Sequence, residues 1–215
     1  MHAILTGGTG MVGGSVLRQL LADDRITKAT SLSRRSTGLS NPKLTEVLEV
    51  DFSKPDSVAP HITGADILFH CIATYAHTVD KATYETVTVE YFRTMLAALA
   101  AVNPNAAVVH FSASGTNLKE NSWYKALNTK GRAEKVLWAS EFPRRIAYRP
   151  AGIIPTRAEN VKGIPDQIFK LIFRVFPFIG TDSDQLARAV VGFALSDGKD
   201  GTILKHPDIA KLLRA

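Results

Sequence analysis

Cysteine is almost absent from this chain of 215 residues, because Cys71 is the only one. A single cysteine excludes an intrachain disulfide and a cysteine-based metal cluster, and it fits a reducing compartment. The histidines are isolated and the carboxylates are not clustered, so we expect no metal site. Three charged residues interrupt the apolar stretch from Ile164 to Ile179, which argues against a membrane span. The first strand is expected to begin at His2, so we expect no targeting segment and a cytoplasmic protein.

Long basic runs are missing as well, although the net charge is +6. The lysines and arginines are scattered, and no basic run is longer than Arg34-Arg35 or Arg144-Arg145. This distribution favours an anionic small ligand over nucleic acid. Hydrophobic residues make up 45% of the chain, which is enough for a sizeable buried core. At this length we expect one core with a modest C-terminal addition.

Short apolar runs alternate with amphipathic stretches, which indicates a parallel sheet covered on both faces. Apolar spacing predicts helices over about 12–21, 87–102, 122–140 and 184–195, with Asp182 or Ser183 as the cap of the last one. The pattern predicts an α/β protein with a doubly wound, Rossmann-type parallel sheet and a small C-terminal extension on the substrate side. The predicted strands are His2–Leu5, Ala29–Ser33, Leu44–Val50, Asp66–Cys71, Ala107–Ser112, Arg145–Arg149 and Thr202–Leu204.

The region from Thr156 to Gly180 departs from this alternation. It is dense in isoleucine and phenylalanine and contains Pro165 and Pro177. Two interpretations use the same residue types: a lid over a substrate, and a helix that packs on the sheet. Both stay open from the sequence.

Glycines recur directly after the first predicted strand, at Gly7, Gly10 and Gly13. Gly7 allows a tight turn with positive φ, Gly10 removes a side chain where the backbone would approach a pyrophosphate, and Gly13 lets the helix pack closely. The amino end of that helix, with its free N–H groups, would stabilise the phosphates. A strand, a glycine turn and a helix in this order predict a dinucleotide site.

The second predicted strand ends at Ser33-Arg34-Arg35-Ser36. In dinucleotide-binding folds a carboxylate at this place binds the ribose 2′-hydroxyl, whereas guanidinium groups hold a 2′-phosphate. We therefore expect NADP(H) in preference to NAD(H). Asp51, after the third strand, would lie near the adenine. Cys71, Ile72 and Ala73 would run beneath the adenosine ribose and the pyrophosphate.

The glycine spacing, the Arg34-Arg35 pair and Val50-Asp51 together resemble the short-chain dehydrogenase/reductase superfamily, in its extended and atypical branches. Brevity and a Lys-Gly-x-x-Glu element make the chain most similar to the small atypical group around the Tat-interacting oxidoreductase-like proteins. Further matches are Ser112-Ala113-Ser114, Lys130-Gly131-Arg132-Ala133-Glu134, Arg149-Pro150-Ala151-Gly152 and residues 181–189. The cofactor contacts expected from these residues and from the resemblance are Gly7, Thr9, Gly10, Met11, Val12, Gly13, Arg34, Arg35, Asp51, Phe52, Cys71, Ile72, Ala73, Lys130, Pro150 and Ile153.

The superfamily uses a tyrosine as proton donor and a lysine four residues later, which lowers the tyrosine pKa and holds the nicotinamide ribose. Residues four apart share one helical face, so both side chains reach one ligand. If Lys130 holds the lysine position, Ala126 stands where the tyrosine is expected. Tyr124 is then the predicted donor, provided that the helix begins after it. Asn128, four residues further on, is able to orient the phenol but not to shift its pKa as a cation would.

A serine orients the substrate carbonyl in the superfamily, and Ala113 stands at or near its position. We expect Ser114 to take this role, with Ser112 as the alternative. His70 and His110 lie among apolar residues and are expected to be core histidines. Further candidates for a replacement acid lie in the loop after the fourth strand: Tyr75, His77 and Tyr84.

These residues predict an NADPH-dependent reductase of a carbonyl or activated alkene on a small apolar substrate, with Ser114, Tyr124 and Lys130 as its catalytic residues. The displaced tyrosine leaves two alternatives, an NADPH-binding regulator without redox turnover and a non-redox isomerase or cyclase on the same fold. We expect residues 1–155 to form the dinucleotide-binding Rossmann core. Residues 156–215 would add a small C-terminal substrate or lid segment to the same compact unit. Both a monomer and a homodimer are compatible with the sequence.

Overall fold

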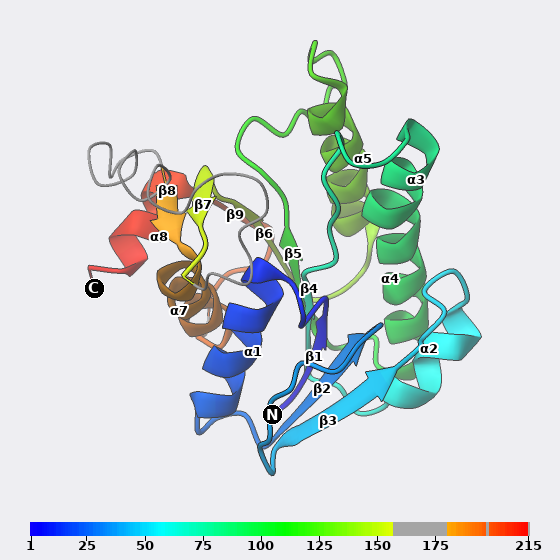
Figure 1. Cartoon of the computed structure of the whole chain (residues 1–215), viewed down its shortest axis with the longest axis vertical. Helices are drawn as coiled ribbons and strands as arrows, with labels where there is room; N and C mark the ends of the chain where they lie inside the picture. The colour runs from blue at the N-terminus through cyan, green and yellow to red at the C-terminus, as the bar shows by residue number, and fades with distance from the viewer. Residues whose placement is uncertain (157–179, 197, 215) are drawn as a thin grey trace.

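A computed structural model gives the fold and describes residues 1–156, 180–196 and 198–214. Seven strands form one sheet in the order β3-β2-β1-β4-β5-β6-β9, and every neighbouring pair is parallel (Figure 1). The order reverses between β1 and β4, and at such a reversal folds of this kind bind their ligands. The strands are β1 (His2–Thr6), β2 (Lys28–Ser33), β3 (Leu44–Leu48), β4 (Ile67–His70), β5 (Ala107–Phe111), β6 (Arg144–Arg149) and β9 (Thr202–Lys205).

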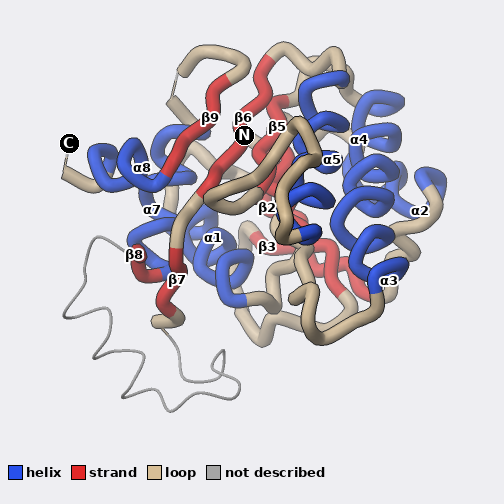
Figure 2. Tube along the Cα trace, turned by 90° about the horizontal axis from the view of Figure 1, so that it is seen from above, coloured by secondary structure: helices blue, strands red, loops and turns tan. Residues whose placement is uncertain are grey.

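Helices cover both faces of the sheet (Figures 1 and 2). On one face α7 (Ser183–Ala194) packs against α1 (Met11–Ala22), and on the other lie α2 (Pro55–Ile62), α4 (Tyr91–Val102) and α5 (Lys125–Ala139). Successive strand residues point to opposite faces, so Leu5 packs with α1 and α7 while Ile4 packs with α2 and α4. The strands are therefore buried on both sides, as their apolar sequences require.

One long helical segment carries the residues that face α5. It consists of α3 (Lys81–Glu85), a π-helical turn η1 (Thr86–Glu90) and α4, which follow one another without a break. Asp80 caps its start, because the carboxylate accepts a hydrogen bond from the Thr83 N–H at 2.9 Å. The π-helical turn packs against α5, and such turns occur often at functional sites.

The last part of the chain adds one strand to the main sheet, a separate pair of strands and a short helix. The strands β7 (Gly152–Ile154) and β8 (Gly180–Asp182) form a separate parallel pair, β9 lies beside β6, and α8 (His206–Leu212) follows β9. Asp182 caps α7 by accepting from the N–H groups of Asp184 and Gln185 at 3.1 and 2.7 Å. The division of the chain between residues 155 and 156 stays a prediction.

All seven predicted strands are present, so the predicted doubly wound α/β fold is confirmed. The third predicted helix begins at Lys125 instead of Ser122, since Tyr124 is its N-cap residue. Helix α2 was not predicted: it contains Pro55 and Pro60, and proline breaks a helix interior although it is tolerated in the first turn, where Pro55 stands. It also missed α3, α8 and the β7–β8 pair.

The isoleucine- and phenylalanine-rich region falls almost entirely on residues 157–179, which lie outside the described residues. Its two interpretations therefore stay open. In the part of the chain that the structure describes, no helix combines the length and the apolar character that a membrane crossing requires.

Candidate functional site

The turn between β1 and α1 is shaped by two glycines. Gly7 has a φ of +76°, and a Cβ on it would lie 2.8 Å from the Cys71 carbonyl oxygen. A Cβ on Gly13 would lie 2.1 Å from the Gly7 carbonyl oxygen. The same carbonyl accepts a hydrogen bond from the Gly10 N–H at 2.9 Å. Side chains at both positions are therefore sterically excluded, and the turn closes tightly on the end of β4.

The outer side of this turn has room for a ligand. Among the described residues, a Cβ on Gly10 would meet only the Gly7 carbonyl oxygen, at 3.2 Å. Gly10 is the N-cap of α1, and no side chain caps that helix. Thr9 is exposed, and Met11 and Val12 are half-buried. The amino end of α1 thus has N–H groups available for an anion at the point where the strand order reverses.

The end of β2 carries two positively charged side chains, Arg34 and Arg35. Arg34 and Arg35 are exposed, and neither forms an ion pair with another residue that the structure describes. The Ser33 hydroxyl donates to the Arg35 carbonyl oxygen at 2.7 Å. The Glu46 carboxylate on β3 accepts two hydrogen bonds, at 2.7 and 2.6 Å, from residues 36 and 37. That carboxylate fixes the loop, so both guanidinium groups are available to an external anion.

Asp51 and Phe52 lie in the turn that leads to α2. The Asp51 carboxylate accepts from the N–H and the hydroxyl of Ser53 at 2.9 and 2.6 Å and pairs with Lys54 at 3.3 Å. The hydrogen bonds from Ser53 are the main cause that holds the pKa of Asp51 below its usual range. Phe52 is buried, with its ring 5.9 Å from that of Tyr91, so its side chain belongs to the core.

The residues that follow β4 run under the glycine turn. The Cys71 N–H lies 3.2 Å from both the carbonyl oxygen and the hydroxyl of Thr6, which ties the end of β4 to β1. Burial raises the pKa of the Cys71 thiol well above its usual range, so the thiol stays neutral. Cys71 and Ile72 are half-buried and Ala73 is exposed. Their contacts with a cofactor stay predictions.

Two of the three residues predicted for catalysis, Tyr124 and Lys130, lie at the start of α5. Tyr124 precedes the helix, is 47% exposed, and has its ring 5.9 Å from that of Trp123, which is 90% exposed. Ala126 is buried, so the position expected for the tyrosine holds no polar side chain. Lys130, one turn further on the same helical face, is half-buried. The backbone of Tyr124 therefore lies at the N-cap of α5, whereas the backbone of Lys130 lies within the helix.

Two serines follow β5 in different surroundings. Ser112 is buried, and its hydroxyl lies 2.8 Å from the Thr116 hydroxyl. Ser114 is exposed, and its N–H donates to the Pro150 carbonyl oxygen at 2.8 Å. The Ser114 hydroxyl has no partner within the described residues, so it is the serine that is available to a substrate. Pro150 is buried, and Ile153 in β7 is half-buried.

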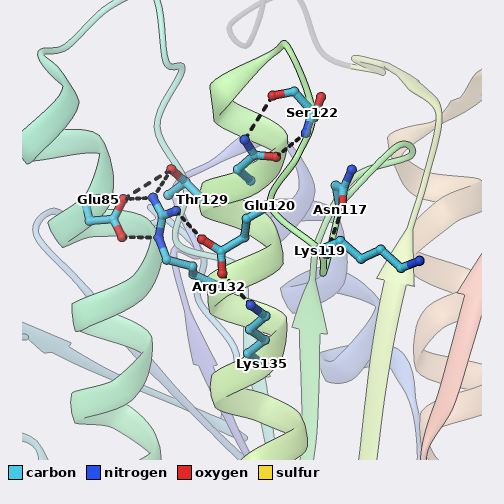
Figure 3. Close-up of polar contacts among 9 residues, drawn as sticks. Glu85, Asn117, Lys119, Glu120, Ser122, Thr129, Arg132 and Lys135 are labelled. Carbon is cyan, nitrogen blue, oxygen red and sulfur yellow. Dashed lines mark hydrogen bonds and ion pairs between the residues drawn. The ribbon is translucent and has the colours of Figure 1, made fainter.

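Asn128 holds the loop that precedes α5 (Figure 3). Its Oδ1 accepts from the Ser122 N–H and its Nδ2 donates to the Ser122 carbonyl oxygen, both at 3.0 Å. The amide is therefore used by the loop backbone. The expected role of Asn128 in orienting Tyr124 is not the one that its contacts support.

Ion pairs join α3, α5 and the same loop (Figure 3). The Arg132 guanidinium donates to Glu85 through Nε at 2.6 Å and also through Nη2, and to Glu120 through Nη1 at 2.9 Å. Lys135 pairs with the other oxygen of Glu120. The hydrogen bonds to Glu85 are the main cause that raises the pKa of Arg132 above its usual range. The network thus ties the end of α3 and the loop before α5 to α5 itself.

Two buried histidines lie near the carboxyl ends of β4 and β5, at the edge of the sheet where the glycine turn also lies. His70 ends β4 and pairs in register with His110 on β5. Their exposed fractions are 1% and 3%, their ring centroids lie 5.9 Å apart, and Phe92 on α4 packs on both rings. The Nδ1 atom of His70 lies 3.1 Å from the Thr6 hydroxyl. Nε2 of His70 and both ring nitrogens of His110 have no hydrogen-bond partner among the described residues.

The positive charge of Lys130 contributes to the lowered pKa values of both histidines. Burial, followed by the charge of Lys130, lowers the pKa of His70 to about 3. Burial, followed by His70 and Lys130, lowers the pKa of His110 well below its usual value. Both residues were expected in the core, which their burial agrees with, but their place near the carboxyl edge of the sheet was not predicted. The available signal was their matching place near the carboxyl ends of two adjacent, otherwise apolar strands.

A buried ion pair fixes α5 to β6. Glu134, one turn after Lys130, is 0% exposed, and its two oxygens accept from Nε and Nη2 of Arg149 at 2.8 and 2.5 Å. This two-point contact is the geometry in which a guanidinium binds a carboxylate most strongly. The carboxylate that follows Lys130 on α5 is therefore engaged by another cation.

Comparisons with known proteins agree with this geometry. A family model described as NAD(P)H-binding matches residues 7–156. Protein FMP52, mitochondrial, of Debaryomyces hansenii is 26% identical over 225 residues, which cover 99% of this chain and 96% of that protein. Protein HTATIP2 of Rattus norvegicus is 25% identical over 162 residues, 74% of this chain and 65% of that protein. A solved short chain dehydrogenase family protein from Francisella tularensis has a TM-score of 0.70 at 17% identity, covering 97% of this chain and 98% of that one.

The expected cytoplasmic location is contradicted by these relatives. Proteins from four yeasts that match this chain, all named FMP52, carry the word mitochondrial in their names. The expectation was based on the single cysteine, Cys71, and on a first strand at His2. A scarcity of cysteine excludes disulfides but does not distinguish one reducing compartment from another.

The matched region contains the glycine turn and the arginine pair, and it ends just after β7. It also contains the corner around Lys130, by which we mean His70, His110 and residues 124–134. The fold around these residues is the doubly wound sheet that their spacing predicts. The chain therefore belongs to the NAD(P)H-binding family, and it resembles the atypical short-chain dehydrogenase/reductases, in particular the Tat-interacting oxidoreductase-like proteins.

Proposed function

We propose that this protein is an NADPH-dependent oxidoreductase that reduces a carbonyl or an activated alkene of a small apolar substrate. The observation that carries the proposal is the pair of exposed arginines, Arg34 and Arg35, beside a glycine turn that has no room for side chains at Gly7 and Gly13. The open side of Gly10 and the uncapped end of α1 fit a pyrophosphate. Two guanidinium groups that form no ion pair with any described residue fit a 2′-phosphate.

The residues of the site then have distinct roles. NADPH, when bound, supplies a hydride to the substrate carbon. The amino end of α1 binds the pyrophosphate, and Lys130 binds the nicotinamide ribose, the role that the resemblance gives to the family lysine. The exposed Ser114 hydroxyl donates a hydrogen bond to the substrate oxygen and polarises the carbonyl. The substrate would lie at the carboxyl edge of the sheet.

Cofactor preference is tested by titrating the purified protein with NADPH and with NADH and measuring dissociation constants by fluorescence. Replacing both arginines, Arg34→Ala with Arg35→Ala, should weaken NADPH binding about 100-fold and change NADH binding little, because charge-assisted bonds to the 2′-phosphate are lost. The matched control is Arg188→Ala with Lys199→Ala, which removes the same charge from exposed positions elsewhere. Equal weakening in both double variants would mean that only net charge matters and would contradict the proposal.

Turnover is tested by following NADPH oxidation with a panel of aldehydes, ketones and enones. Ala126 favours a second candidate function, an NADPH-binding regulator, because the expected tyrosine is missing. Binding without oxidation of NADPH by any member of the panel would support that candidate. A protein partner whose affinity differs between the NADPH and NADP⁺ complexes would then be its positive evidence.

A further inference from the structure

Gly131, the glycine of the Lys-Gly-x-x-Glu element, is buried in the middle of α5. Glycine destabilises a helix interior relative to alanine, so a steric reason is expected for its presence. A Cβ on Gly131 would lie 2.1 Å from the carbonyl oxygen of Asn117 and 2.7 Å from the carbonyl carbon. The backbone of the loop between β5 and α5 therefore rests directly on the helix. We call this contact between Gly131 and the Asn117 carbonyl group the α5 notch.

The loop is attached to α5 at further points along its length. The Asn117 N–H donates to the Leu127 carbonyl oxygen at 3.2 Å. The Asn128 amide forms two hydrogen bonds, both at 3.0 Å, with the backbone of Ser122. Between these points the Glu120 carboxylate binds two cations of α5 (Figure 3). The loop therefore follows the surface of α5 from the notch to the start of the helix.

Ser114 lies in a tight turn just before the α5 notch. The turn consists of residues 113–116, in which the last N–H donates to the first carbonyl oxygen at 3.1 Å and Gly115 has a φ of +80°. A positive φ at the third residue is typical of a type II turn. The Ser114 N–H donates to the Pro150 carbonyl oxygen at 2.8 Å. The exposed Ser114 hydroxyl is therefore placed by two attachments, one to the residue after β6 and one to α5 through the notch.

We propose that Gly131 is a positioning residue, which sets the place of the Ser114 hydroxyl relative to the ribose site at Lys130. This inference rests on the proposed NADPH-dependent reduction. Two successive residues of α5 then serve one geometry, because Lys130 binds the cofactor ribose and Gly131 receives the loop whose serine binds the substrate oxygen. One helix thereby sets the distance between the cofactor and the substrate carbonyl. An error of about 1 Å in such a distance lowers a rate about 100-fold.

Gly131→Ala is expected to move the serine without changing the glycine turn. Cβ atoms essentially never lie within 3.0 Å of such an atom, so the Asn117 carbonyl has to move by about 1 Å. The obstructing atom belongs to the backbone, so no side-chain rotation makes this space. The turn that carries Ser114 directly precedes Asn117 and moves with the loop, whereas residues 6–13 lie on other elements.

The first experiment compares cofactor binding with reaction rate. In Gly131→Ala the dissociation constant for NADPH, measured by fluorescence, should stay within about threefold, while the single-turnover rate of NADPH oxidation should fall about 100-fold. Gly192→Ala in α7 is the control, because it is also a helical glycine and no described atom lies within 4 Å of its Cβ. It should retain both values. An unchanged rate in Gly131→Ala, or a loss of NADPH affinity as large as the loss of rate, would overturn the inference.

A double-mutant cycle with Ser114→Ala shows whether Gly131 acts through the serine. Ser114→Ala alone should lower the single-turnover rate, because the hydrogen bond to the substrate oxygen is lost. Adding Gly131→Ala to that variant should lower the rate by less than about threefold, since no hydroxyl is left to displace. A further loss of about 100-fold would show that Gly131 supports the protein in general, and it would overturn the positioning role. A normal rate in Ser114→Ala would overturn it as well.

Hydrogen exchange measures the attachment of the loop without any turnover. The N–H groups of Ser114 and Asn117 donate to carbonyl groups after β6 and in α5, so both should exchange about tenfold faster in Gly131→Ala. The N–H groups of β1 should keep their rates. Unchanged exchange at Ser114 and Asn117 would overturn the inference alone. Absence of NADPH oxidation by the unaltered protein with the whole panel would overturn the proposed function, and the positioning role with it.

If Gly131→Ala does not fold, the other end of the loop provides the same test. Asn128→Ala removes both hydrogen bonds to the Ser122 backbone, whereas Asn128→Asp keeps the acceptor for the Ser122 N–H. Asn128→Ala should lower the rate about tenfold or more, Asn128→Asp should lower it less, and neither should add to the loss in Ser114→Ala. Losses that add in full would overturn the inference.

Discussion

In the turn between β1 and α1, glycines stand where a Cβ would collide with the backbone, whereas in the first turn of α5 an alanine stands where a phenol is expected. The glycine cradle, by which we mean residues 6–13, thus keeps the family pattern. The corner around Lys130 does not. The two regions lie at the same edge of one sheet, so the difference is not one of fold but of what each region must do.

Binding a pyrophosphate depends on backbone N–H groups and on close approach, and only the absence of side chains provides both. Proton transfer depends on one acidic group within reach of the substrate, and several residue types are able to supply it. Few residue types are therefore tolerated in the cradle, whereas several are tolerated in the corner. The alanine at position 126, where a tyrosine is expected, therefore bears on the mechanism and not on cofactor binding.

The largest effect on cofactor binding is expected from Gly13→Ala. The added Cβ would lie 2.1 Å from the Gly7 carbonyl oxygen, so the turn must open. NADPH binding should be lost at concentrations that saturate the unaltered protein, and unfolding experiments should show a loss of about 1–3 kcal/mol. Gly192→Ala in α7 is the control, because nothing lies within 4 Å of its Cβ, and it should leave binding intact. Normal NADPH binding by Gly13→Ala would contradict the assigned cradle.

The largest effect on stability is expected at the corner, from Glu134→Gln. The change leaves the Arg149 guanidinium without its carboxylate, and breaking a buried pair in this way costs about 3–5 kcal/mol of unfolding free energy. Denaturant titration should show this loss. The control Asp200→Asn breaks the half-exposed pair with Arg145 and should cost about 1 kcal/mol or less. Similar losses in both variants would mean that the Glu134 pair does not anchor α5.

The sequence identifies the cradle more completely than the corner, for a physical reason. Gly7 and Gly13 act within a few residues of each other, so local spacing specifies the geometry. The corner draws His70, His110 and Lys130 from three elements, β4, β5 and α5, and no local pattern in the sequence relates these elements. The strands were predictable because their apolar runs are continuous, and their order follows from the doubly wound topology. The bounds of α5 and the role of Asn128 depended on loop contacts that the sequence does not show.

Acid should weaken the corner more than the cradle. The pKa values of His70 and His110 lie below 6.5 in the folded chain, so the unfolded chain binds more protons. Their contribution is complete above pH 6.5 and is lost as the pH falls below it. By pH 5 each histidine should cost about 2 kcal/mol of stability. Denaturant titration at pH 7.5 and 5 checks this, and His110→Phe should remove about half of the pH dependence. Equal stability of the unaltered protein at both pH values would show that the imidazoles are not buried as neutral groups.

The smallest effect is expected from Asp182→Ala, outside both regions. Its carboxylate caps α7 by accepting from two N–H groups, and losing such a cap costs about 1 kcal/mol. Asp182→Asn keeps an acceptor oxygen and should cost less. Because α7 packs on α1, the variant separates general stability from the geometry of the cradle. The dissociation constant for NADPH should stay within about twofold of the unaltered value. A larger loss of affinity would show that the amino end of α1 depends on α7 for its position, and the cradle would then be less local than its glycines suggest.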